Sequence, residues 1–382
     1  MRQDKHATAP RLTRRSTVLG LAGAVLAGAA FERSSGARAD FKLELEPPLR
    51  SRTQVSGIRY GCAGAAPIVQ PDRILLEKFA IEANIFSPEG SLKWIQTEPQ
   101  PGKFDFAEGD SIAAFAAHND MLMHGHTLVW YTANPDWVAN LKTGQEAQAA
   151  LERHINIEVA HYRRKIWAWD VVNEALEPDD HLAEDYRDSV WFRCLGAGYI
   201  DLSFRLARAV NPQVPLCLSE YGIEYTGPKP QRRRAALLAL LRKLREQNTP
   251  VDCLSLQSHL EAHQKFDRAE LTGFLREVVK LGYRLMITEL DVNDCRIIGN
   301  PDQRDRVTAH HLAEYLDIVF GVAKPLSIAT WGLSDRSTWL RQYWKRADGS
   351  PLRPLPLDAD LNRKPMWAVL ARYLAGQEPH PK

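Results

Sequence analysis

Eight short apolar segments recur along this chain and alternate with segments of helical periodicity, and this alternation constrains the fold most. In the helical segments Leu, Ala, Val and Phe recur at steps of three and four residues. Strands that alternate with helices are typical of a parallel sheet, and eight of them predict a closed (β/α)8 TIM barrel of the α/β class. The predicted strands lie at 57–62, 82–87, 122–130, 166–173, 214–219, 252–258, 284–292 and 326–332. The clearest predicted helices lie at 110–119, 144–163, 189–210, 229–247 and 268–281.

An open, doubly wound sheet is the main alternative to the barrel. Such sheets more often carry a glycine-rich phosphate loop after the first strand, but Gly57, Gly61 and Gly64 lack the GxGxxG spacing. We therefore predict one barrel domain over residues 40–382, with a polar lead-in at 40–56 and a last helix at 364–375. Barrels of this length are common as single domains.

The first 39 residues predict an export signal of the twin-arginine type. Arg14 and Arg15 precede an apolar stretch at 18–31, and an Ala-Arg-Ala sequence at 37–39 fits a signal-peptidase site. The apolar stretch is shorter than the ~20 residues that span a bilayer. We expect export to the periplasm or the outside of a bacterial cell; a basic N-terminal tail that stays on the protein is the alternative.

Composition excludes some classes of partner and cofactor. A formal net charge of +2 over 382 residues gives no reason to expect nucleic acid or an anionic membrane. His118, His124 and His126 lie close in sequence, but no cysteine or carboxylate completes a ligand set. We expect no metal, no organic cofactor and a monomeric protein.

The five cysteines have no metal-ligand spacing, and their odd number leaves at least one thiol free. Cys217 and Cys253 lie in predicted strands and are expected to be buried small hydrophobic residues. The sequence alone cannot pair the other three cysteines, so it does not decide whether two of them form a disulfide.

Polar or aromatic side chains follow seven of the eight predicted strands. Functional residues of a (β/α)8 barrel lie at the C-terminal ends of its strands, so these residues are candidates for one site. In chain order they are Glu89 with Lys93 and Trp94, His126 with Trp130, Asn173 with Glu174, Glu220 with Tyr221, Gln257 with His259, Glu289, and Trp331.

Glu174 and Glu289 each end a short apolar strand or lie near its end. A buried carboxylate is costly unless it is hydrogen-bonded or used. Two carboxylates on opposite sides of a barrel mouth suggest glycoside hydrolysis, in which one acid protonates the leaving oxygen and the other attacks carbon or activates water. A salt bridge to a barrel arginine is the alternative for either residue.

The motifs around these residues resemble those of glycoside hydrolase family 10, the family of retaining endo-β-1,4-xylanases, from about residue 57 to 375. By this resemblance Glu174 is the general acid/base and Glu289 the nucleophile. The matching segments are LKW at 92–94, EP at 98–99, GKFDF at 102–106, GHTLVW at 125–130, WDVVNE at 169–174, LQSHL at 256–260, ITELD at 287–291, and WG at 331–332 followed by SD at 334–335 and Trp339.

The resemblance also implies roles for the other strand-end residues. Asn173 is expected to hydrogen-bond the sugar 2-OH, and Gln257 and His259 are expected to contact the two glutamates and hold their protonation states apart. His126 is expected to bind the sugar next to the scissile bond. Lys93 is expected to bind the distal sugar, Trp331 and Trp339 to form a stacking wall, and Glu89, Trp130 and Tyr221 to complete the substrate-binding set, with barrel packing as the alternative for Trp130.

Several positions depart from the family pattern. Gly90 replaces a sugar-binding asparagine, His124 an arginine, Tyr131 a histidine and Ala133 a glutamine. Glu220 stands in a Ser-Glu-Tyr-Gly segment where the family has an Asn-Asp-Tyr-Asn type; it is either a third carboxylate near the site or a partner of an arginine such as Arg284.

These departures leave the glycan open. Xylan or a related β-1,4-glycan is the leading substrate, and a β-glucan or an acidic heteropolysaccharide is the alternative for the same mechanism. A non-catalytic carbohydrate-binding barrel is a third reading, which two opposed carboxylates disfavour.

Overall fold

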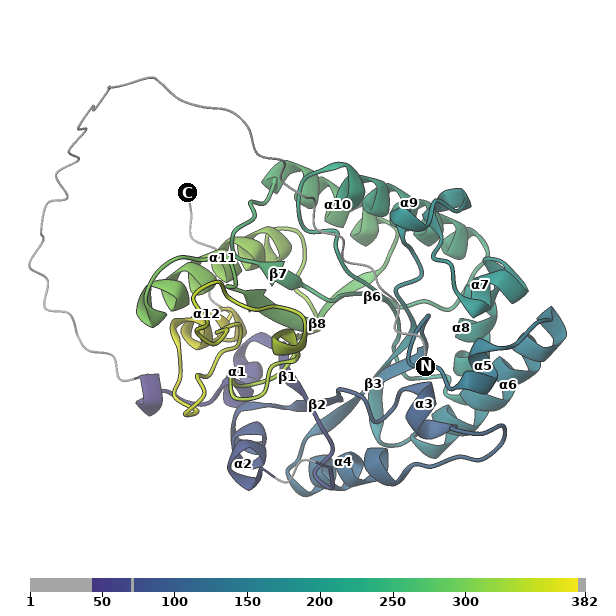
Figure 1. Ribbon diagram of the computed structural model, residues 1–382, viewed down its shortest axis with the longest axis horizontal. Coiled ribbons are helices and arrows are strands. Elements are labelled where there is room, and N and C mark those ends of the chain that lie inside the picture. The colour runs from purple at the N-terminus through teal and green to yellow at the C-terminus, as the bar shows by residue number, and fades with distance from the viewer. Residues whose placement is uncertain (1–42, 70–71, 377–382) are drawn as a thin grey trace, which may run out of the picture. The chain divides into compact units, whose positions relative to one another are not determined.

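The computed structural model describes residues 43–69 and 72–376, so the predicted export signal at 1–39 lies outside the described residues. Eight parallel strands close into a barrel in the order β1-β2-β3-β4-β5-β6-β8-β9, and β9 pairs back onto β1 (Figure 1). A further short strand, β7, pairs only with β8. The strands are β1 (Arg59–Gly64), β2 (Ile85–Pro88), β3 (Leu122–Val129), β4 (Ile166–Asn173), β5 (Leu216–Glu220), β6 (Cys253–Leu256), β7 (His259–Glu261), β8 (Arg284–Asn293) and β9 (Ser327–Thr330).

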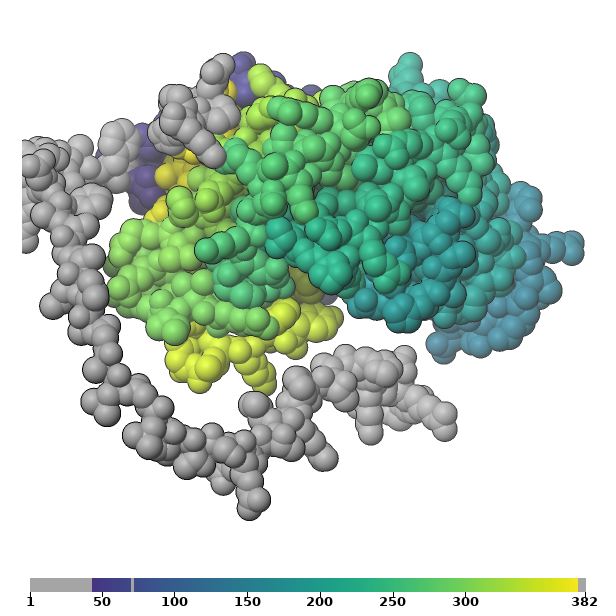
Figure 2. Space-filling view, turned by 90° about the horizontal axis from the view of Figure 1, so that it is seen from above, coloured from purple at the N-terminus to yellow at the C-terminus, as the bar shows by residue number. Residues whose placement is uncertain are grey.

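The longer helices surround this barrel (Figure 1), and Figure 2 shows one side of the outer layer, where the teal-to-green part of the chain forms a continuous surface. The predicted barrel and its eight strands are therefore confirmed. The helices of eight or more residues are α1 (Leu49–Ser56), α2 (Arg73–Glu82), α4 (Ala107–His118), α6 (Gly144–His161), α8 (Gly198–Val210), α9 (Pro228–Glu246), α10 (Arg268–Lys280), α11 (Pro301–Phe320) and α12 (Pro365–Leu374).

One local prediction was wrong. The helix predicted at 189–210 is two helices, α7 (Val190–Leu195) and α8, because Gly196 at the end of α7 takes a left-handed φ of 59° that an α-helix cannot continue through. The predicted polar lead-in contains a helix that was not predicted, α1, whose Leu49 is buried. A single buried position in eight residues gives too weak a periodicity to predict this helix.

Several helix starts follow from local capping side chains. Thr143 and Asn300 cap α6 and α11, and in each case the third helical residue, Glu146 or Gln303, returns a hydrogen bond to the capping residue. Asp267 caps α10 in the simpler way, by accepting from one backbone N–H. These side chains fix where the helices begin and so fix the lengths of the loops that carry the site.

The core lies inside the barrel and between the barrel and its helices. Trp169 and Trp191 are buried in this core. All five cysteines are free thiols, and Cys217 and Cys253 are buried, as expected. Among residues 43–69 and 72–376 no helix is long and apolar enough to cross a membrane.

Candidate active site

A cleft of about 820 Å³ opens at the C-terminal ends of the barrel strands. Its lining includes twelve of the fourteen residues predicted from the strand ends and the motifs: Glu89, Lys93, His126, Trp130, Asn173, Glu174, Tyr221, Gln257, His259, Glu289, Trp331 and Trp339. The other two, Trp94 and Glu220, are buried outside this lining. The barrel thus brings together side chains that span 250 positions of sequence. The sequence-based prediction did not include other residues of the lining, among them Ala65, Ser91, Gln96, Glu108 and Tyr343.

Glu174 follows β4 in a left-handed conformation, with a φ of 56°. Its backbone N–H donates to the carbonyl of Ser219, which holds this turn against β5. Its Oε1 accepts from the amides of Asn173 (3.2 Å) and Gln257 (3.0 Å). Two neutral donors therefore hold one carboxyl oxygen, and Oε2 accepts no hydrogen bond from the described residues.

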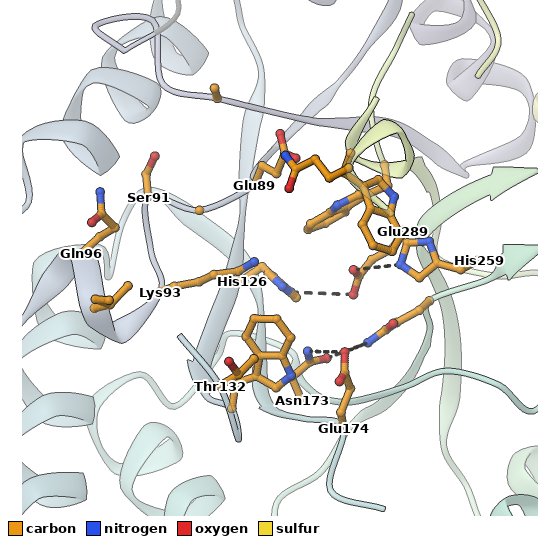
Figure 3. A pocket seen from close by; sticks show the side chains of 18 of the residues that line it. Glu89, Ser91, Lys93, Gln96, His126, Thr132, Asn173, Glu174, His259 and Glu289 are labelled. Atoms are coloured by element: carbon orange, nitrogen blue, oxygen red, sulfur yellow. Dashed lines mark hydrogen bonds and ion pairs between the residues drawn. The ribbon is translucent and has the colours of Figure 1, made fainter. Parts of the chain in front are cut away.

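Glu289 lies within β8 and faces two histidines across the cleft (Figure 3). Its Oε2 is 3.5 Å from Nε2 of His259, and its Oε1 is 3.9 Å from Nδ1 of His126. Its backbone N–H donates to the carbonyl of Gln257. Since the side chain of Gln257 also binds Glu174, this one glutamine connects the two carboxylates.

His259 is held between two carboxylates of β8. Its Nδ1 lies 3.1 Å from Oδ2 of Asp291, which also accepts from the indole of Trp339 at 2.7 Å. Burial by itself lowers the pKa of His259, but Asp291 and Glu289 outweigh it and raise the pKa to about 10. The imidazole is therefore a cation at neutral pH, and it stabilises the negative charge of Glu289. Asp291 was missed as a supporting residue, although side chains two apart on a strand share a face.

Asp170 forms a second buried group beneath the cleft. Its Oδ2 lies 2.8 Å from Nε2 of His124 and 3.1 Å from Nδ1 of His126, and its Oδ1 accepts from Ser255. Burial opposes ionisation, but the two histidines hold the pKa of Asp170 well below its usual range. An aspartate inside an otherwise apolar strand is the signal that could have revealed it.

His126, Asp170 and Glu289 offer ligand atoms within 4.8 Å of one another, which is compatible with a small cation. Nδ1 of His126 already has Asp170 as a hydrogen-bond partner, so hydrogen bonding explains this cluster. The expectation of no metal stays a prediction.

Lys93 reaches from the loop after β2 into the cleft, beside His126 (Figure 3). Its ammonium lies 4.6 Å from the ring centroid of Trp130 and 6.0 Å from that of Trp331. Burial lowers the pKa of Lys93, although the carboxylates of Glu289, Glu89 and Glu174 act to raise it. Trp130 thus lines the cleft.

Tyr221 forms part of the opposite wall. Its hydroxyl accepts from Nη2 of Arg187 at 3.0 Å and donates to Glu177 at 3.1 Å, and the guanidinium of Arg233 lies 4.3 Å from its ring centroid. Tyr131 is 40% exposed on the rim of the cleft, with the guanidinium of Arg187 4.1 Å from its ring centroid.

Glu220 is a further buried carboxylate near the site. Its Oε1 accepts from the backbone of Leu176 at 3.0 Å. Burial raises its pKa to about 8, and the opposing charges of Arg233 and Arg187 only partly offset that effect. The suggested partner Arg284 is instead exposed at the start of β8, at the other end of the barrel. Glu220 is therefore a buried neighbour of the site, and the cations near it are Arg233 and Arg187.

The chain is similar to one family of known proteins. The family model described as Glycosyl hydrolase family 10 matches residues 49–373. The chain is 31% identical to endo-1,4-beta-xylanase 1 of Humicola insolens over 290 residues, which are 75% of this chain and 64% of that protein. It is also 31% identical to endo-1,4-beta-xylanase A of Phanerodontia chrysosporium over 75% of this chain and 66% of that protein. The matched part of the chain thus spans just under two thirds of the length of both relatives.

Among solved structures, xylanase 10B of Thermotoga petrophila in complex with xylobiose superposes with a TM-score of 0.79. The sequences are 28% identical, and the match covers 87% of this chain and 98% of that structure.

Proposed function

Since this chain belongs to glycosyl hydrolase family 10, we propose that it is a retaining endo-β-1,4-xylanase that hydrolyses xylan or a closely related β-1,4-linked glycan. The observation that carries the proposal is one cleft that holds Glu174 and Glu289 in different environments. Glu174 is bound at one oxygen by two neutral amides, and Glu289 faces the cationic His259. The first environment leaves Oε2 of Glu174 free to give up and regain a proton, and the second suits an ionised nucleophile.

In the first step, a carboxylate oxygen of Glu289 attacks the anomeric carbon while Glu174 protonates the glycosidic oxygen, and the aglycone leaves. In the second step, Glu174 removes a proton from water, which attacks the same carbon and releases Glu289. Two inversions give net retention. This mechanism requires carboxyl groups about 5–5.5 Å apart, whereas a gap of ~6.5–9.5 Å is typical of inverting enzymes.

The rest of the cleft supplies sugar contacts. Asn173, which already binds Glu174, is placed to hydrogen-bond the 2-OH, and His126 and Lys93 offer polar groups on the other side of Glu289. Trp331 and Trp339 give apolar planes for the C–H faces of the sugar rings. A protein that only binds glycan needs such donors and planes but has no use for the opposed carboxylates, so the geometry favours hydrolysis. The xylobiose bound by the Thermotoga petrophila xylanase supports a xylo-oligosaccharide as ligand.

Three measurements test the proposal. NMR of the first products from xylotetraose is expected to give the β-anomer, and the α-anomer would contradict retention. A 2-deoxy-2-fluoro xylobioside with a good leaving group is expected to label Glu289, and Glu289→Ala is expected to abolish hydrolysis while xylohexaose still binds. Assays on xylan, mixed-linkage β-glucan and an acidic heteropolysaccharide then compare the glycans, and hydrolysis of none of them refutes the function.

We also propose that the protein is exported through the twin-arginine route and acts as a monomer outside the cytoplasm. The support is the arginine pair Arg14-Arg15 before an apolar stretch, and a polymeric substrate that does not enter cells. Replacing both arginines with lysine is expected to leave xylanase activity in the cytoplasm. Unchanged export of that variant would refute the route.

A further inference from the structure

Arg187 is a buried arginine that the proposed mechanism does not use. It lies between the short 3-10 helix at Ala183–Asp185 and α7, it is 7% exposed, and it is absent from the lining of the cleft. It therefore lies behind the catalytic residues and cannot act on a substrate directly. Its contacts nevertheless converge on Glu174 and on the loop that follows β4.

The first set of contacts fixes the backbone of this loop. Nε of Arg187 donates to the carbonyl of Glu174 at 2.8 Å, and Nη2 donates to the carbonyl of Leu176 at 3.3 Å. The backbone N–H of Arg187 also donates to the carbonyl of Ala175. Glu174 has a left-handed φ of 56°, which residues with a Cβ adopt only when their surroundings impose it. Three hydrogen bonds from one residue supply that constraint.

The second contact concerns the carboxyl group itself. Nη2 of Arg187 lies 3.9 Å from Oε2 of Glu174, the oxygen that accepts no hydrogen bond from the described residues, whereas Oε1 is occupied by two amides. Oε2 is thus the oxygen that is free to carry the proton. A neighbouring cation stabilises the carboxylate that remains after the proton has moved to the leaving group.

The third set of contacts holds the guanidinium still. It lies 4.1 Å from the ring centroid of Tyr131, and Nη2 donates to Tyr221 at 3.0 Å and to Glu177 at 3.4 Å. Glu177 is itself paired with Arg233 at 2.8 Å. The cation therefore sits in a stiff cage that also includes two aromatic side chains of the cleft.

We propose that Arg187 is a positioning residue for the acid step: it imposes the backbone conformation of Glu174 and places one fixed cation beside Oε2. The inference rests on the proposed hydrolase function. It predicts a specific defect, because only bond cleavage that needs a proton depends on Glu174 as an acid.

The test compares kcat/KM for aryl β-xylobiosides whose leaving groups range from 2,4-dinitrophenol, which departs without a proton, to phenol, which needs one. For Arg187→Met we expect a loss of about 100-fold with phenol and less than about fivefold with dinitrophenol. Arg187→Lys keeps the charge without the planar fork of the guanidinium. Its kcat/KM with the phenol leaving group is expected to lie between those of the unaltered protein and Arg187→Met.

Arg234→Met is the matched control. Arg234 is also buried, and it also donates to two backbone carbonyls, of Ile223 and Tyr225, and to one carboxylate, of Glu270. Any loss in this variant is expected to be equal for all leaving groups.

An equal loss across the series for Arg187→Met and Arg187→Lys would overturn the proposal and leave Arg187 a structural residue. Circular dichroism checks that each variant is folded. If Arg187→Met is not folded, the leaving-group dependence of Arg187→Lys alone tests the proposal. Failure of the unaltered protein to hydrolyse the dinitrophenyl substrate would instead refute the hydrolase function.

Discussion

Asp291→Asn removes the carboxylate that holds His259 in its charged form. His259 lies 3.1 Å from Asp291 and 3.5 Å from Glu289, and its pKa is raised to about 10 from an ordinary value of 6.5. Between these two pH values the folded protein binds one proton more than the unfolded chain. This group alone therefore lowers the free energy of unfolding by about 1.4 kcal/mol for each unit by which the pH rises.

The stabilisation is fully present below pH 6.5 and is lost as the pH rises through about 10. The whole shift corresponds to about 5 kcal/mol, which the three groups share. We expect Asp291→Asn to remove the larger part, about 3 kcal/mol at pH 7. The asparagine keeps an acceptor for the indole of Trp339, so the loss reports on charge rather than packing.

Urea unfolding at pH 7, 8 and 9, followed by tryptophan fluorescence, measures this directly. From pH 7 to pH 9 the free energy of unfolding of the unaltered protein is expected to fall by about 2–3 kcal/mol. Asp291→Asn is not expected to show this fall, so the two proteins become more similar in stability as the pH rises. Asp188→Asn is the control, because its pair with Arg193 is about half exposed on both sides and is worth little. Parallel pH dependences for the unaltered protein and Asp291→Asn would refute the reasoning.

Three further predictions concern the site and the barrel. Glu174→Ala is expected to turn over dinitrophenyl xylobioside in the presence of azide and to release the β-xylobiosyl azide, which NMR identifies; the absence of that product contradicts the acid/base role. Gly125→Ala is expected to destabilise the protein by about 3 kcal/mol in urea unfolding, because its Cβ would lie 2.1 Å from the ring of Trp169; an unchanged midpoint would show that the ring moves freely. Gly90→Asn, whose Cβ meets no atom within 4 Å, is expected to change stability by less than about 0.5 kcal/mol and to lower KM for xylan by restoring a side-chain amide. A KM that rises instead would mean that the open space itself serves the substrate.

The barrel and its reactive edge could be predicted because their signals are local. Apolar runs broken by helical periodicity identify strands and helices one at a time, and a glutamate at the end of an apolar run stands out without any knowledge of its neighbours. The family motifs then gave roles to the same positions. Twelve of the fourteen candidate residues meet in the cleft, because parallel barrel strands bring their C-terminal ends to one rim.

Errors arose where the signal was weak or the partner distant. The break at Gly196 was hidden because both flanking segments continue a helical pattern. The sequence left two roles open for Glu220, and Arg284, the example given of an arginine partner, was wrong. A sequence does not show which arginines the loops bring close to a buried carboxylate.

The sequence by itself thus determined the class of fold, the two opposed carboxylates and half of the cleft lining, because each depends on residue type and spacing along one segment. Only the tertiary structure decided how those carboxylates are tuned. The cation at His259 depends on Asp291 and Glu289, and the fixed guanidinium beside Glu174 depends on Arg187 in its cage of Tyr131, Tyr221 and Glu177. Electrostatic tuning depends on distance and burial in space, and those are set by the packing of segments far apart in the chain.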